Sequence, residues 1–319
     1  MRLSGSPREK KIAEKDSFLA NVTISNSVKS NKFTGITCAI LCSIGLGLAV
    51  ALGPMTFNGG TTPLTVALFR ALFSIFLMGG LCLLLGKSLR LSLPMCLNML
   101  VLGTLFSHMA FGNIGSTQYI PISLAALLFF IYPPVVTLIN AFLDQKYPGN
   151  IKISAVIISF AGLSIMLGIG FEKFDCRGVI IGITAGIACA VNIVWVSRRV
   201  QAVHPFVIVF YQSIVAAIII LGLLIKFDDF SIPETNFGWW GFCLIILLQS
   251  CSIPLFYFSV QRIGSETTGI LNNLQPVASI IAAVLIFNEI LTMQIVVGAI
   301  MVLFGIMIVQ YLDFQRKRP

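Results

Sequence analysis

The sequence predicts an all-α membrane protein in which ten transmembrane helices form two inverted five-helix repeats. Of the 319 residues, 57% are hydrophobic and only 10% are charged, whereas about 25% of residues are charged in an average soluble chain. Ten apolar stretches each have about 20 residues, the number that a helix needs to cross a bilayer. Prolines and glycines also recur in the two halves at a spacing near 143 residues. These three observations define the expected fold.

The ten apolar stretches are predicted to be helices and not membrane β-strands. They lack strict apolar–polar alternation, and a barrel strand would be about half as long. In chain order, the expected spans are 33–53, 63–85, 93–113, 120–143, 151–170, 178–197, 206–225, 238–260, 266–287 and 291–312.

The internal repeat determines the expected topology. The pairs separated by 143 residues are Pro133 with Pro276, Gly162 with Gly305, and Gly35 with Gly178. Because five is an odd number, the second five-helix unit must enter the membrane from the opposite side, which gives an inverted repeat. The predicted segments are a disordered cytoplasmic tail at 1–32, a first repeat at 33–170, an external linker at 171–177, a second repeat at 178–312 and a basic cytoplasmic tail at 313–319.

The distribution of Lys and Arg predicts the orientation. If the N-terminus is cytoplasmic, seventeen of the 21 Lys and Arg residues lie in cytoplasmic segments and three lie in outer segments. Cytoplasmic loops of membrane proteins carry this excess of positive charge. Both termini are therefore expected in the cytoplasm. The net charge of +9 largely reflects this bias, so no nucleic-acid partner is expected. The short loops favour a bacterial cytoplasmic (inner) membrane.

The stretch at 287–309, FNEILTMQIVVGAIMVLFGIMIV, resembles the end of an EamA domain. That family places a Glu after the fourth helix of each repeat and follows it with a Gly-rich fifth helix, which here implies Glu289, Gly298 and Gly305. The resemblance implies the drug/metabolite transporter superfamily, with two EamA repeats over roughly 34–312. The first half departs from the pattern, because Lys146 stands 143 residues before Glu289. The family carries cargo from amino acids to nucleotide sugars and drugs, so the resemblance does not choose a substrate.

Two basic side chains are predicted within the spans, while all twelve carboxylates lie outside the spans or near their ends. A cation–proton antiporter usually needs a carboxylate deep in the membrane, so this mechanism is disfavoured. Arg70 would either snorkel or pair with helix carbonyls, or contact an anionic group of a substrate. His108 would be either a hydrogen-bonded core histidine, or a substrate contact or proton relay.

Three amides directly precede a proline in the middle of the ninth span, and they predict a polar cavity. They are Asn272, Asn273 and Gln275, and Tyr132 and Trp195 are expected to line the same cavity. Alternatively, such residues only form hydrogen bonds between helices. The prolines that interrupt spans are Pro133 in the fourth, Pro254 in the eighth and Pro276 in the ninth. Pro133 and Pro276 would be hinges or cavity walls at the midplane, or simple kinks that shape packing.

These observations predict a secondary transporter that moves a small polar metabolite, amino-acid-like or anionic, by alternating access. The alternatives are a drug-efflux transporter of hydrophobic compounds, a membrane-embedded enzyme and a receptor. With two histidines and no deep acid, no catalytic residue, metal site or cofactor is expected. The expected partners are a small-molecule substrate and the lipid bilayer. A homodimer is possible, although the glycine pair at 182 and 186 favours packing within the chain.

Overall fold

The computed structural model describes residues 32–116, 119, 120, 122–145, 147, 149–166, 175–287 and 292–315. Within these ranges the secondary structure is helical and contains no strand, which confirms the all-α class. The N-terminal helix covers residues 32–51. The other helices are α2 (Gly53–Phe57), α3 (Pro63–Leu84), α4 (Leu93–Ser116), α5 (Ile122–Phe129), α6 (Tyr132–Asp144), α7 (Asn150–Met166), α8 (Cys176–Arg199), α9 (Pro205–Phe227), α10 (Asn236–Ile263), α11 (Ser265–Leu271), α12 (Leu274–Phe287) and α13 (Met293–Gln315).

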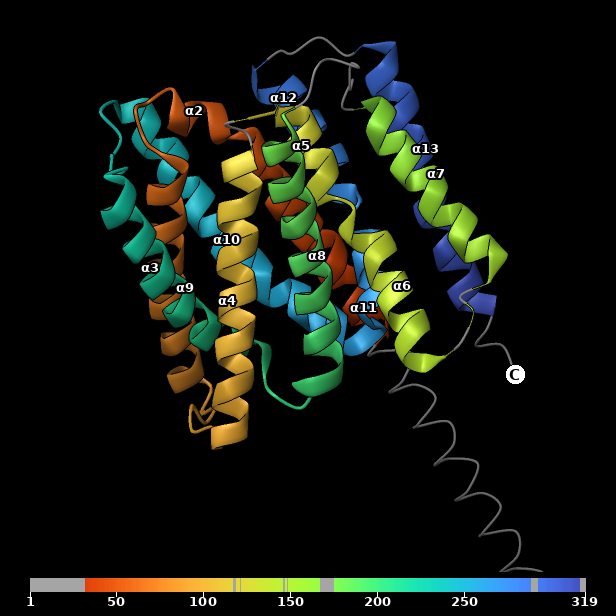
Figure 1. Cartoon of the computed structure of the whole chain (residues 1–319), viewed down its shortest axis with the longest axis horizontal. Coiled ribbons are helices and arrows are strands. Elements are labelled where there is room, and N and C mark those ends of the chain that lie inside the picture. The colour runs from red at the N-terminus through yellow and green to blue at the C-terminus, as the bar shows by residue number, and fades with distance from the viewer. Residues whose placement is uncertain are drawn as a thin grey trace, which may run out of the picture.

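Seven of the described helical segments are long and apolar enough to cross a membrane, and two shorter apolar helices accompany them. The seven correspond to the first three expected spans and to the sixth through the ninth. The fifth and tenth expected spans contain the shorter helices α7 and α13. The fourth expected span is divided into α5 and α6, so neither piece reaches membrane length. The chain is thus a multi-pass integral membrane protein, and Figure 1 shows its long helices side by side in one bundle.

Several expectations concern residues outside the described ranges. They are the tail at 1–31, positions 167–174 between the halves, Lys146, Glu289 and the last four residues of the basic tail.

Local sequence signals explain where several membrane helices begin. Thr62, His204 and Thr235 cap α3, α9 and α10, and each side chain accepts a hydrogen bond from a backbone N–H in the first turn. Prolines follow directly at the start of α3 and α9, where the N–H that proline lacks would have had no partner within the helix.

Prolines interrupt two of the three predicted spans. The fourth span is broken between α5 and α6, and Pro133 lies in the first turn of α6. The ninth is broken at residues 272–273, and Pro276 lies in the first turn of α12. The predicted break at Pro254 is wrong, because α10 continues through this residue from Asn236 to Ile263. A single proline removes one backbone N–H, and the flanking turns of this 28-residue helix stay helical.

Close glycine contacts between the two halves follow the 143-residue spacing. A Cβ at Gly162 would lie 2.8 Å from the carbonyl oxygen of Gly298, and one at Gly305 would lie 2.7 Å from the carbonyl oxygen of Ala155. Adding 143 to 155 gives 298, and adding 143 to 162 gives 305, so these contacts between α7 and α13 are equivalent. Early residues of one helix meet late residues of the other, so equivalent helices run antiparallel. This geometry is that of an inverted repeat.

A second pair of contacts obeys the same relation at the helix starts. A Cβ at Gly35 would lie 2.7 Å from Ile263, and one at Gly178 would lie 2.8 Å from Ile120. Position 263 minus 143 is 120, so Ile263 and Ile120 are equivalent positions in the two halves. The start of the first helix of each half therefore packs against the equivalent residue of the other half. The two halves therefore interlock, and their interface contains the polar residues described below.

The surface of the bundle is apolar and its interior contains many polar groups. Large exposed side chains include Phe76, Leu84 and Leu285, which are at least 77% exposed. Buried polar residues include Ser43, Gln212, Asn272 and Thr268. This arrangement suits a protein in lipid, where the apolar face contacts acyl chains and polar groups are satisfied inside the bundle.

Candidate functional site

The broken ninth span carries a buried hydrogen-bond cluster that joins three helices. The Asn272 amide Nδ2 donates to the Tyr132 hydroxyl at 2.8 Å and to Gln275 Oε1 at 3.2 Å. Asn272 Oδ1 accepts from Ser43 Oγ of the N-terminal helix at 2.9 Å. Tyr132 begins α6, directly after the break in the fourth span. The structure therefore brings together the two breaks and three of the predicted site residues.

Asn273 lies beside this cluster and has an unused acceptor. Its side chain is as buried as that of Asn272, at 6% exposure, but Asn273 Oδ1 has no hydrogen-bond partner. An unpaired buried carbonyl costs about 1–3 kcal/mol, and such groups are rare in folded proteins. Asn273 Oδ1 is thus suited to accept a hydrogen bond from a water or a bound molecule.

Arg70 extends from α3 into the space between α4 and α10. Its Nη1 donates to Gln249 Oε1 at 2.8 Å, and the guanidinium carbon lies 5.1 Å from the ring centroid of Phe106. Arg70 Nε is buried and has no partner. Among the described residues, the ion pairs involve other side chains, and no carboxylate lies within salt-bridge distance of Arg70. Arg70 is therefore a partly buried cation with an amide and an aromatic ring as neighbours.

The N-terminal helix shows that Arg70 and Gln275 lie at a similar depth. Gln249 is near the middle of α10, thirteen residues after Asn236. A Cβ at Gly45 would lie 3.9 Å from the carbonyl oxygen of Leu248, and one at Gly47 would lie 2.6 Å from that of Gln275. Gly45 and Gly47 are less than one helical turn apart. The Arg70–Gln249 pair and the Asn272 cluster therefore flank the same short stretch of the N-terminal helix, at mid-bundle.

A further buried polar cluster joins α8, α9 and α10. The Tyr257 hydroxyl lies 2.7 Å from Gln212 Oε1 and 3.0 Å from Asn192 Oδ1, and its one proton can serve one acceptor at a time. Asn192 Nδ2 donates to the carbonyl oxygen of Leu102 at 3.2 Å. Gln212 Nε2 is buried without a partner. Since neighbouring helices supply these bonds, the cluster has the character of helix–helix packing.

Two predicted site residues are not among the side chains that form the mid-bundle clusters. Trp195 lies four residues before the end of α8, where its Nε1 donates to Asn98 Oδ1 at 2.8 Å and its ring faces Arg199 at 6.0 Å. His108 of α4 is exposed, which does not fit a buried core histidine. The structure thus does not bring either residue to Asn272.

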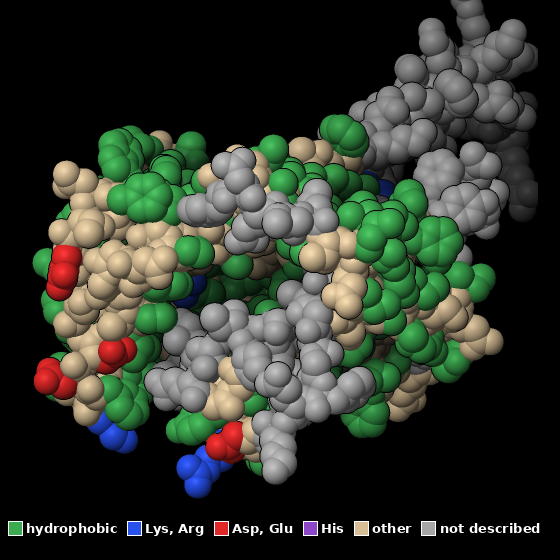
Figure 2. Space-filling view, turned by 90° about the horizontal axis from the view of Figure 1, so that it is seen from above, with side chains coloured by type: hydrophobic (Ala, Val, Ile, Leu, Met, Phe, Trp, Pro, Cys, Tyr) green, Lys and Arg blue, Asp and Glu red, His purple; other side chains and the backbone are tan. Residues whose placement is uncertain are grey.

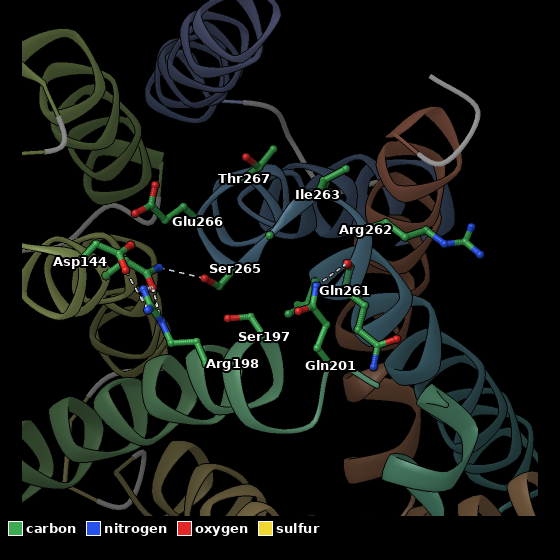
Figure 3. Close-up of a pocket in the computed structure, with 13 residues that line it drawn as sticks. Asp144, Ser197, Arg198, Gln201, Gln261, Arg262, Ile263, Ser265, Glu266 and Thr267 are labelled. Atoms are coloured by element: carbon green, nitrogen blue, oxygen red, sulfur yellow. Dashed lines mark hydrogen bonds and ion pairs between the residues drawn. The ribbon is translucent and has the colours of Figure 1, made fainter. Parts of the chain in front are cut away.

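A pocket of about 450 Å³ opens at the end of the bundle that holds α11, the end expected to face the cytoplasm. Polar and charged side chains of α6, α8, α10 and α11 dominate its lining (Figure 3). The polar lining residues are Asn140, Asp144, Ser197, Arg198, Gln201, Gln261, Arg262, Ser265, Glu266 and Thr267. Sequence reasoning missed this site, because its members come from three separate stretches of the chain and follow no motif.

The opposite end of the bundle is hollowed. Figure 2 views the face that is uppermost in Figure 1, and it shows a depression near the centre with hydrophobic side chains in its depth. Within the described residues, no group of three or more His, Cys, Asp or Glu side chains is arranged to hold a metal ion.

Comparisons with known proteins identify the family resemblance. Residues 176–311 match the model of the EamA-like transporter family. The chain is 26% identical over 203 residues to an uncharacterized transporter of Synechocystis sp.. That alignment covers 61% of this chain and 61% of the relative, so less than two thirds of the relative's length is spanned. These matches confirm the resemblance drawn from 287–309, and they point to a transporter and not an enzyme.

The fold also has a counterpart among solved structures. A crystal structure covers 91% of this chain and 99% of its own, with a TM-score of 0.74. The sequence identity is 19%, so this likeness concerns the fold alone.

Proposed function

We propose that this chain, an EamA-type membrane transporter by the match of its residues 176–311, moves a small polar metabolite across the membrane by alternating access. The cargo is anionic or amino-acid-like. The site lies at mid-bundle between the two halves, where inverted-repeat transporters bind their substrates. Arg70, Asn273 and Gln275 are its proposed contacts, and Tyr132 and Asn272 hold the wall in place. Trp195 and His108 are left out, because they lie apart from this group.

The observation that carries the proposal is the guanidinium of Arg70, whose buried Nε has no hydrogen-bond partner and which has no counter-ion among the described residues. A buried charge without a counter-ion is costly in a low-dielectric interior, and in membranes such groups mark substrate or ion pathways. The aromatic ring of Phe106 and the amide of Gln249 offset part of this cost, but neither neutralises the charge. A carboxylate or phosphate on the substrate would do so, and it would also accept a hydrogen bond from Nε.

Asn273 supplies a complementary contact. Its unpaired Oδ1 accepts a hydrogen bond, as from the ammonium group of an amino acid. The site would then hold a donor for a negative group and an acceptor for a positive one. The break that contains Asn273 separates the ninth span into two pieces, and the fourth span is divided in the same way. In each span the two pieces can move relative to one another as the halves rock.

Both termini would lie in the cytoplasm, because the positive charges gather on one side. The short loops favour a bacterial cytoplasmic membrane. The repeats span 33–170 and 178–312, and the symmetric glycine contacts support this division.

Counterflow in proteoliposomes tests the proposal. Purified protein is supplied with labelled amino acids, phosphorylated sugars, nucleotides, S-adenosylmethionine and hydrophobic cations, and Arg70→Ala and Arg70→Lys are compared with the native chain. A hydrogen bond to a charged group contributes about 1.5–3 kcal/mol, so we expect Arg70→Ala to lower exchange of one anionic or zwitterionic compound about 10- to 100-fold. Arg70→Lys keeps the charge and loses the fork of donors, so its loss should be smaller.

The matched control is Arg90→Gln, since Arg90 is an exposed arginine just after α3. It should transport like the native chain. Thermal unfolding of each variant in detergent checks that the fold is retained. If only hydrophobic cations exchange, or if a folded Arg70→Ala transports normally, Arg70 is structural and the chain is a drug-efflux transporter of hydrophobic compounds.

A further inference from the structure

At the pocket end of the bundle, α11 of the second half is attached to α6 and α7 of the first half. The Asn140 Nδ2 of α6 donates to Ser265 Oγ at 2.8 Å. Lys152 of α7 forms a hydrogen-bonded ion pair with Glu266. Both second-half partners lie in the first turn of α11, directly after Gly264. Two successive residues of one short helix thus hold the two halves together at this end.

Arg198 of α8 positions the Asn140 amide. Its Nε and Nη2 donate to Asn140 Oδ1 at 3.2 and 2.8 Å, and its Nη1 donates to Asp144 Oδ1 at 2.9 Å. Because Oδ1 accepts from the guanidinium, the Nδ2 of the same amide is directed toward Ser265. Figure 3 shows this convergence: the side chains of Asp144, Arg198 and Ser265 point toward one place at the edge of the pocket.

These contacts combine burial with access to water. Asn140 and Ser265 are 6% and 5% exposed, and the side chains of Lys152 and Glu266 are 11% and 23% exposed. The pocket beside them is open and polar. The side chains of Lys152 and Glu266 are mostly buried, so the ion pair can separate only if water replaces each partner. The polar pocket beside them gives water that access, so the attachment is specific in geometry and can be released without exposing an apolar core.

The two ends of the broken spans differ. Below the breaks, α6 and α11 pack together, and a Cβ at Gly269 would lie 3.6 Å from the Tyr132 ring. Above the breaks, α5 and α12 make no comparable contact within the described residues. The hollow in Figure 2 lies at this upper end. Within the described residues, the two broken spans are thus joined at the end that holds α11 and are not comparably joined at the other end, and the breaks lie between these ends.

We propose that Asn140, Lys152, Ser265 and Glu266 form a cytoplasmic latch, positioned by Arg198, which keeps the inner end shut while the outer end is open. The inference rests on the proposed function, since a latch has a role only if the two ends open in turn. Release separates α11 from α6 and α7, lets water enter through the pocket, and allows α12 to approach α5. The latch biases the balance between the two states.

Hydrogen–deuterium exchange of the full chain in detergent tests the latch without any substrate. In the double variant Asn140→Ala with Glu266→Gln, we expect exchange of residues 132–144 and 265–271 to rise about tenfold. Exchange of residues 122–129 and 274–287 should slow in the same sample, because the population shifts to a state closed at the other end. The reciprocal change distinguishes a latch from ordinary packing.

Two further variants complete the test. Arg262→Gln removes a charge that lines the same pocket, but Arg262 stacks on Phe258 of its own helix and so does not join the two halves through that contact. Its hydrogen–deuterium exchange is therefore expected to match that of the native chain. The swap Lys152→Glu with Glu266→Lys restores the ion pair in reverse and should return the native pattern, which also keeps the test readable if the double variant does not fold. Faster exchange at the inner end alone, or no change, overturns the latch. Failed counterflow would instead reject the transport proposal and leave the exchange result intact.

Discussion

Two neighbouring asparagines with equal burial allow a sharp test of the mid-bundle site. Asn272 and Asn273 are both 6% exposed. Asn272 takes part in three side-chain hydrogen bonds, to Tyr132, Gln275 and Ser43, whereas Asn273 has an unpaired Oδ1. Replacing each by Ala changes the same atoms at the same depth, so the difference between the variants measures the hydrogen bonds.

The expected loss of unfolding free energy depends on which partners of Asn272 are left without a hydrogen bond. In Asn272→Ala, Ser43 can direct its one hydroxyl proton to the carbonyl oxygen of Ala39, 2.8 Å away, and Gln275 is half-buried. The hydroxyl of Tyr132, a residue that is 1% exposed, loses the hydrogen bond from Asn272 Nδ2. At about 0.6 kcal/mol for an average hydrogen bond between membrane helices, and more for a stranded group, the loss is about 1–2 kcal/mol. Asn273→Ala removes an unpaired buried carbonyl, which favours the folded state, and it also removes side-chain packing. Because these two effects oppose each other, its unfolding free energy should not fall by more than about 0.5 kcal/mol.

Thermal and SDS-induced unfolding in mixed micelles measure both variants, with counterflow on the same preparations. We expect Asn272→Ala to have the lower Tm of the two variants, reduced by about 2–4 °C for each kcal/mol of stability lost. Asn273→Ala should keep native stability and lose transport. Equal destabilisation by the two variants would refute the assignment of partners. Native transport by Asn273→Ala would remove Asn273 from the site.

Three further predictions concern packing, polar contacts and pH. Gly305→Ala places a Cβ 2.7 Å from a backbone oxygen and should lower the unfolding free energy by about 1–3 kcal/mol, whereas Gly222→Ala, with no atom within 4 Å, should be neutral or stabilising in the same SDS titration. Tyr257→Phe removes the one hydroxyl proton that Asn192 and Gln212 can accept and should cost about 1–2 kcal/mol in that assay; no change would mean that water replaces the hydroxyl. Partial burial and nearby Lys87 lower the pKa of His204, so the native state binds its proton less readily than the unfolded state, and stability should fall as the pH drops below about 6.5; NMR titration should show the pKa moving toward its ordinary value in Lys87→Gln.

The sequence alone determined the class of the protein and its family resemblance. Composition and span length suffice for the all-α membrane fold, because the bilayer requires about 20 apolar residues per crossing and satisfied backbone groups. Antiparallel contacts between Gly162, Gly305 and their equivalents are in line with the 143-residue spacing. Pro133 and Pro276 indicated two of the breaks, since proline favours the first turn of a helix. Pro254 misled, because one missing hydrogen bond does not end a 28-residue helix.

Only the tertiary structure decided which polar side chains meet. Arg70 and Gln249 are 179 residues apart in the chain, and Ser43 and Asn272 are 229 apart, so no local spacing relates them. Trp195 and Asn272 were both predicted to line the same cavity. In the structure, Trp195 lies near the end of α8 and Asn272 lies at the break after α11. The contacts of Asn140 and Arg198 were equally hidden. Helix packing places these groups, because facing directions depend on how the two halves rotate against each other, and periodicity within one span carries no record of that rotation.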